Sequence, residues 1–226
     1  MRDILSSQAF GIMLTLLFYL LGGFLYRKTK WPIFSPLLVA TLLLMGYILI
    51  ADIDMNTFLT DLSGIHLFLG PLIVSLAVPI VKQFNLIKKN ILPIVVGSIV
   101  GAATSILAVY VLGDWLHLDQ EILYSIIPKA STTPIAIEVS EQIGGIRAIT
   151  VAVVVMTAVI GAVIIPMVVK LLKITDPRII GLGLGTTSQA VGTAKALEID
   201  ATAGAISGVA LVFTGIATAL IALFIH

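Results

Sequence analysis

Two stretches of the sequence carry residue types that could bind a small anion inside an otherwise apolar chain. GLGLGTTSQAVGTAK, residues 181–195, contains four glycines, four hydroxyl residues, a glutamine and a lysine. PKASTTP, residues 128–134, sets Lys129 and three hydroxyl residues between two prolines. A charge at membrane depth costs about 2.5 kcal/mol or more and usually serves a function. The N-terminus of a broken helix also offers N–H donors to an anion.

We expect the carboxylate of a small substrate to bind near mid-membrane, where segments 65–81 and 180–197 cross and the turn at 128–134 reaches in. The expected binding residues are Lys129, Thr132, Thr133, Thr186, Thr187, Ser188, Gln189 and Ser75. Glu138 and Lys195 are candidates for ion coupling. The alternative for Glu138 is a structural ion pair, and for Lys195 a pair with Glu198 within helical reach. The alternative for 181–195 as a whole is close helix packing, which small residues also permit.

The composition places these residues in a membrane. Of 226 residues, 59% are hydrophobic and 11% charged, where a soluble domain has roughly 25% charged residues. A bilayer-spanning helix needs about 20 apolar residues. Stretches of about that length are 8–26, 32–51, 91–112, 148–169 and 203–225. The chain is therefore expected to be an integral membrane protein with essentially no soluble domain.

The same composition argues against several function classes. The chain has no cysteine, and its three histidines lie far apart without metal-ligand spacing, so we expect neither a metal nor another cofactor. No catalytic triad, metal cluster or carboxylate pair stands out, so we do not expect an enzyme. The basic residues are dispersed among short loops, and we expect no nucleic-acid partner.

Loop charges predict the topology, because short cytoplasmic loops are enriched in Lys and Arg. The basic loops are 27–30, 82–89 and 170–178, and they predict an N-terminus outside. Segment 122–147 must then begin and end outside. Pro128 and Pro134 interrupt it, so we interpret it as a re-entrant hairpin with residues 129–133 near the turn. The alternatives are an interfacial helix pair or one kinked span.

A shift of 113 residues aligns the two halves of the chain. It places 69–82 on 182–195 with six identities in fourteen positions, and 91–112 on 204–225. Loop charges predict that the halves run in opposite directions, and inverted repeats with broken helices are typical of transporters. The expected fold is a single all-α membrane domain, 1–226, with halves of about 1–113 and 114–226. It would have about seven full spans, including 180–197, and the re-entrant hairpin.

Four stretches resemble the LrgB/CidB family of bacterial membrane proteins, which includes plastid glycolate/glycerate translocators. They are FSPLLVA (34–40), FLGPLIVSLAVPIVKQ (68–83), PKASTTPIAIEVSEQIGG (128–145) and GLGLGTTSQAVGTAKALE (181–198). The resemblance implies a multi-pass protein of the bacterial cytoplasmic membrane. It also implies transport of small monocarboxylates such as glycolate, glycerate, pyruvate or lactate, and pairing with a small LrgA/CidA-type membrane partner.

Two functions are therefore expected as alternatives. The first is a secondary carrier of a small carboxylate anion, coupled to protons. The second is an antiholin-like or holin-like regulator of murein hydrolase activity and cell lysis, which is the role for which bacterial members are named. We also expect the chain to form a homo-oligomer. A carrier predicts broken helices that face one another, whereas a holin-like role predicts an oligomerising bundle without a dedicated cavity.

Overall fold

The computed structural model describes residues 8–29, 34, 36–51, 53, 71, 74, 77–78 and 80–225. The chain divides into two compact units, residues 1–75 and 76–226. Every regular element in the described ranges is a helix. Four of these helices are long and apolar enough to cross a membrane: α2 (Gln8–Thr29), α7 (Ile91–Trp115), α10 (Arg147–Leu171) and α12 (Ala201–Ala222). The expected all-α membrane bundle is confirmed.

The first unit contains a pair of antiparallel helices, α2 and α3 (Pro36–Ile50). Gly22 lets the helices approach closely, because a Cβ atom there would lie 2.8 Å from the Cα of Pro36. At the other end of the pair, the rings of Phe10 and Tyr47 meet in a tilted arrangement with centroids 6.2 Å apart. Many apolar side chains of both helices are exposed, as expected for helices that face lipid.

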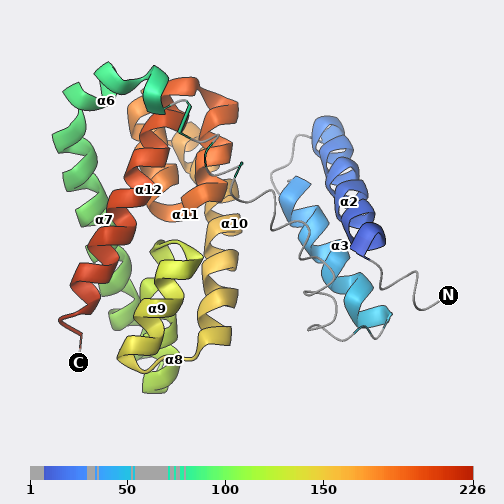
Figure 1. Ribbon diagram of the computed structural model, residues 1–226, viewed down its shortest axis with the longest axis horizontal. Helices are drawn as coiled ribbons and strands as arrows, with labels where there is room; N and C mark the ends of the chain where they lie inside the picture. The colour runs from blue at the N-terminus through green and yellow to red at the C-terminus, as the bar shows by residue number, and fades with distance from the viewer. Residues whose placement is uncertain are drawn as a thin grey trace. The chain divides into compact units, whose positions relative to one another are not determined.

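The second unit contains the short helix α6 (Phe84–Lys89) and is built on three spans, α7, α10 and α12 (Figure 1). Spans α7 and α12 run in the same direction. Ile94 packs with Ile206 near the start of both helices, and Ile106 lies in one apolar cluster with Ile225 near their ends. Halfway along, the Ser98 hydroxyl donates to the Ala210 carbonyl at 3.3 Å. Span α10 runs the opposite way.

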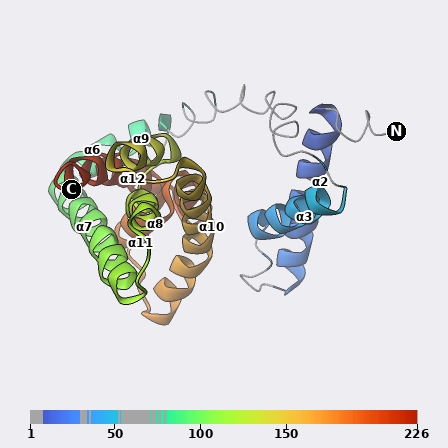
Figure 2. The same cartoon turned by 90° about the horizontal axis from the view of Figure 1, so that it is seen from below.

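The segment between α7 and α10 is a helical hairpin, as the two prolines predict. Helix α8 (Gln120–Ile126) continues into the short 3-10 helix η2 (Ile127–Ala130), and α9 (Thr133–Ile143) returns. Gly144, with φ of 91°, ends α9, and Ile143 packs back against Leu123 of α8. The hairpin therefore starts and ends at the same end of the bundle, flanked by α7 and α10 (Figure 2).

A second hairpin lies where the sequence predicted a full span. Helix α11 (Pro177–Ile199) breaks at Gln189, whose φ is 52° and ψ is −135°. Gly185, before the break, packs against the backbone of Ser207, and Thr193, after it, bonds to the hydroxyl of the same Ser207 at 2.9 Å. Both arms therefore lie against one stretch of α12, and α11 reverses direction at Gln189.

This reversal corrects part of the predicted topology. Segment 180–197 enters from the end where α10 finishes and returns to it, so it is not a full span. Consequently α12 runs parallel to α7, although the loop charges predicted opposite directions for these two segments. Without 180–197, six of the seven predicted spans remain. That number and the division into halves 1–113 and 114–226 stay predictions, because most of the predicted span 65–81 lies outside the described ranges.

The chain does contain an inverted repeat, but each repeat is shorter than the half-chain that the sequence indicated. Residues 120–171 form a hairpin followed by a span, and residues 177–222 form another hairpin followed by a span. The two hairpins enter from opposite ends of the bundle, and the spans that follow them, α10 and α12, are antiparallel (Figure 1). Such inverted pairs of interrupted helices place irregular backbone inside protein rather than against lipid.

Candidate functional site

The tips of the two hairpins meet inside the second unit. The side-chain amide of Gln189, at the turn of α11, donates a hydrogen bond of 2.9 Å to the backbone carbonyl of Lys129 in η2. These residues are 60 positions apart in sequence, and they come from the two stretches singled out as polar. Gln189 is 5% exposed, so the contact is enclosed by protein.

The backbone at Gln189 is unusual for a residue with a side chain. A positive φ combined with a strongly negative ψ is a conformation that glycine adopts far more readily, and such strain persists only where the surroundings hold it. Those surroundings are tight: a Cβ atom on Gly192 would collide with the Leu184 carbonyl oxygen on the opposite arm. The Thr193 hydroxyl donates a hydrogen bond of 3.0 Å to the Gln189 carbonyl. The turn thus presents the glutamine amide to the other hairpin.

Lys129 brings a positive charge to this meeting point. Its half-buried ammonium group donates to the carbonyl and the hydroxyl of Ser105 on α7, at 3.3 and 3.2 Å. No carboxylate in the described ranges lies within 4.0 Å of it, since the ion pairs found there join other residues. A cation held by neutral oxygens in a protein interior can still accept an anion as its partner.

Two more predicted residues, Thr132 and Thr133, lie at the same tip. Thr132 is the residue before α9, its side chain makes no capping bond, and Thr133 is the first residue of the helix. The first N–H groups of a helix have no partner within it. The start of α9 therefore adds donors and a partial positive charge beside Lys129.

The hydroxyl residues of α11 mainly support the hairpin. Thr186 donates to the Leu182 carbonyl at 2.8 Å, and Thr187 donates to the Gly183 carbonyl at 2.7 Å. Ser188 is fully buried and lies 3.2 Å from the Thr187 hydroxyl, close to Gly161 of α10. Each hydroxyl oxygen keeps acceptor capacity, but the donors of Thr186 and Thr187 are directed to the backbone of α11 itself.

The remaining predicted residues do not join this cluster. Ser75 lies outside the described residues. Glu138 is exposed on α9, and Lys195 pairs with Glu198 at 2.7 Å at the far end of the second arm of α11. The described part of the chain contains no group of three histidine, aspartate or glutamate residues that could hold a metal ion.

Sequence reasoning missed Ser105, which holds the Lys129 side chain. It lies in the apolar stretch 91–112, where it is one of few polar residues. A polar residue inside a span is itself a signal of a functional or packing role. Its partner, however, lies 24 residues away, so only the packing of α7 against η2 identifies it.

Comparisons with known proteins agree on one family. The family model described as LrgB-like family matches residues 15–226. An uncharacterized protein, YwbG of Bacillus subtilis, is 35% identical over 95% of this chain and 96% of its own length. Antiholin-like protein LrgB of the same organism is 34% identical over 95% and 94%, and that of Bacillus mycoides is 32% identical over 94% and 93%. No solved structure matches the chain.

Proposed function

The chain belongs to the LrgB-like family, and for this member we propose a secondary carrier that moves small monocarboxylates across the membrane. The observation that carries the proposal is Lys129, a cation at the meeting point of two hairpins without a carboxylate partner in the described ranges. The carboxylate of the substrate would supply that partner.

The arrangement of the hairpins supports transport rather than static binding. Each hairpin enters from its own side of the bundle, and the two are joined at their tips by the bond from Gln189 to Lys129. Movement of one hairpin would expose the tips to one side, and movement of the other to the opposite side. A monocarboxylate needs one charge and a few hydrogen bonds of about 1.5–3 kcal/mol each, which is compatible with the weak binding that release requires.

Uptake into proteoliposomes tests the proposal. Vesicles that contain the protein should accumulate labelled glycolate, glycerate, pyruvate or lactate, and an acidic exterior should increase uptake if protons are coupled. Lys129→Gln should lower uptake about tenfold, which corresponds to about 1.4 kcal/mol, because the variant loses the charge but keeps the size of the side chain. Lys170→Gln, at the end of α10, is the matched control and should transport like the parent.

Equal amounts of each variant in the vesicles must be verified by quantitative blotting. If Lys129→Gln transports like the parent, the tip of the first hairpin does not bind the substrate. If the parent transports none of the four acids, the carrier proposal is wrong for this substrate class.

The names of the relatives favour a second function, antiholin-like control of murein hydrolase activity and cell lysis. A carrier could exert such control indirectly, or the lysis role could be separate from any transport. Expression in a bacterial strain that lacks its own relatives, with and without an LrgA/CidA-type partner, tests this by the rate of autolysis. If Lys129→Gln abolishes both uptake and lysis control, one route serves both. If only uptake is lost, the two functions are distinct.

A further inference from the structure

A cavity of about 260 Å³ opens beside the first turn of α11, at the same end of the bundle as the lysines of α6. One wall carries Asn90 and Pro93 from the start of α7, and the other carries Asp176 and Arg178 from the start of α11. Leu182 of α11 and Ile206 of α12 also line the cavity. The cavity is therefore bounded by the second hairpin, α11, and by α7 and α12, which pack against it.

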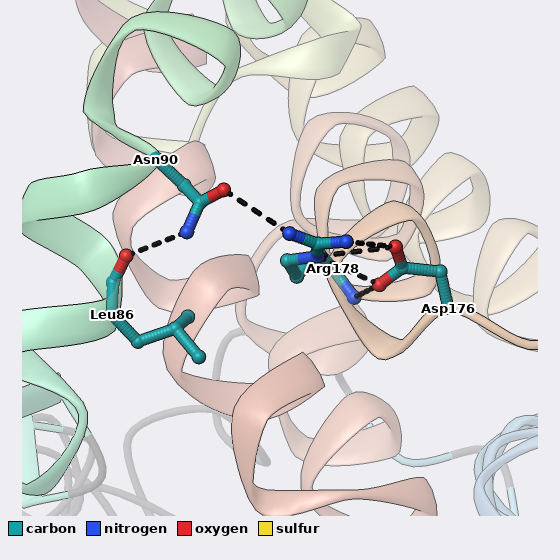
Figure 3. Close-up of polar contacts among 4 residues, drawn as sticks. All are labelled: Leu86, Asn90, Asp176 and Arg178. Carbon is teal, nitrogen blue, oxygen red and sulfur yellow. Dashed lines mark hydrogen bonds and ion pairs between the residues drawn. The ribbon is translucent and has the colours of Figure 1, made fainter.

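The mouth of this cavity is polar, and its polar groups are linked across it. Arg178 donates two hydrogen bonds to Asp176, at 3.0 and 2.6 Å, through its Nε and Nη2 atoms. Its Nη1 atom reaches the side-chain oxygen of Asn90 at 3.4 Å (Figure 3). Asn90 in turn donates to the Leu86 carbonyl at 2.8 Å. About half of the Arg178 side chain remains exposed, so the guanidinium can meet an anion that arrives from solution.

Of the residues of α11 that line the cavity, Leu182 lies nearest along the helix to the turn at Gln189. Leu182 fits against Gly97 of α7, where a Cβ atom would lie 2.6 Å from a Leu182 methyl carbon. One turn further, Thr186 lies against Gly101, where an added Cβ atom would lie 3.3 Å from the Thr186 Cβ. Gln189 follows Leu182 by seven residues, which is about 10 Å along a helix. A leucine side chain thus stands between the cavity and the site.

We propose that this cavity is the entrance for carboxylate anions from the basic end of the bundle, with Arg178 favouring anions at its mouth and Leu182 closing its inner end. The proposal rests on the proposed function, because it assigns the route by which the substrate reaches Lys129. The entrance is a different site from the one at the hairpin tips, because it lies at the end of the bundle and recognises only the negative charge of the substrate.

Accessibility of single cysteines tests the entrance without depending on transport. The chain has no cysteine of its own, so Leu182→Cys provides one thiol at the inner end of the cavity. It should react with a membrane-impermeant anionic thiosulfonate added from the side of α6. Val96→Cys, next to Gly97 but on an exposed face of α7, is the matched control and should stay unreactive in lipid. Pro93→Cys, on the opposite wall, replaces Leu182→Cys if that variant does not fold.

Charge variants at the mouth provide the second measurement. In the Leu182→Cys background, Arg178→Gln should slow the anionic reagent about fivefold and Asp176→Asn should speed it by a similar factor. A fivefold change in rate is the expected effect of one unit charge about 8 Å from the reacting thiol, at an effective dielectric constant of about 40. A cationic reagent should show the reverse order. The proposal is overturned if Leu182→Cys reacts no faster than Val96→Cys, or if both charge variants leave the rates unchanged. Absence of uptake by the parent would refute the carrier, whereas these rates decide the entrance separately.

Discussion

The reversal of α11 at Gln189 can be tested by comparing alanine and glycine at this position. In a continuous helix, glycine is about 1 kcal/mol less favourable than alanine. In the observed turn, with φ of 52° and ψ of −135°, the order should be inverted. A residue with a Cβ atom in such a conformation costs roughly 1–3 kcal/mol, whereas glycine adopts it freely.

The expected magnitude follows from the two opposing terms. Glycine removes the strain but costs about 0.4–1 kcal/mol through the greater freedom of the unfolded chain. Both variants lose the hydrogen bond from the Gln189 amide to Lys129, worth about 1 kcal/mol, so this loss cancels in the comparison. Gln189→Gly should therefore be about 1 kcal/mol more stable than Gln189→Ala. For a chain of this size, that corresponds to a melting midpoint about 2–4 °C higher.

The assay is thermal unfolding of the purified variants in one detergent, at one protein concentration and one heating rate. The sign of the difference is the decisive quantity, because it is opposite for a turn and for a continuous helix. A higher midpoint for Gln189→Ala would refute the reversal, and with it the meeting of the two hairpin tips. Both variants should also transport less than the parent, since neither can make the amide contact.

Three further predictions follow from the same arrangement. A cysteine at Phe224, beyond α12, should be labelled from the face opposite to one at Thr175, because α11 is a hairpin; labelling of both from one face would restore the full span. Gly185→Ala should lower the melting midpoint by at least about 3 °C, since its Cβ atom would collide with the α12 backbone, whereas Gly183→Ala, with its nearest contact at 3.8 Å, should be tolerated. The Arg178 guanidinium hydrogen-bonds the Asp176 carboxylate and lowers the pKa of that carboxyl. The stability gained from this bond is therefore complete above about pH 4, and it is lost as the pH falls through the lowered pKa. Melting midpoints measured from pH 6 downward should therefore fall more steeply for the parent than for Asp176→Asn, and parallel curves would contradict this.

The class of the protein and the first hairpin could be predicted from residue types and their positions. The hydropathy identified a membrane protein, because apolar stretches of about 20 residues are rare in soluble domains. Pro128 and Pro134 interrupted segment 122–147, and both prolines act through local backbone chemistry that is visible without any partner. The loop charges on either side then required the chain to return. Lys129 was recognised for the same reason, as a charge in an interrupted stretch.

The fold of the second polar stretch, and its contact with the first, could not be predicted in this way. The glycines of 181–195 suggested an unwound backbone, but the turn occurs at Gln189, a residue that carries no local turn signal. The neighbouring glycines instead allow close packing: Gly185 against α12, and Gly192 against the other arm of α11. The contact of Gln189 with Lys129 joins positions 60 residues apart. Such pairings depend on how whole helices pack, and this is not encoded in the spacing of any single segment.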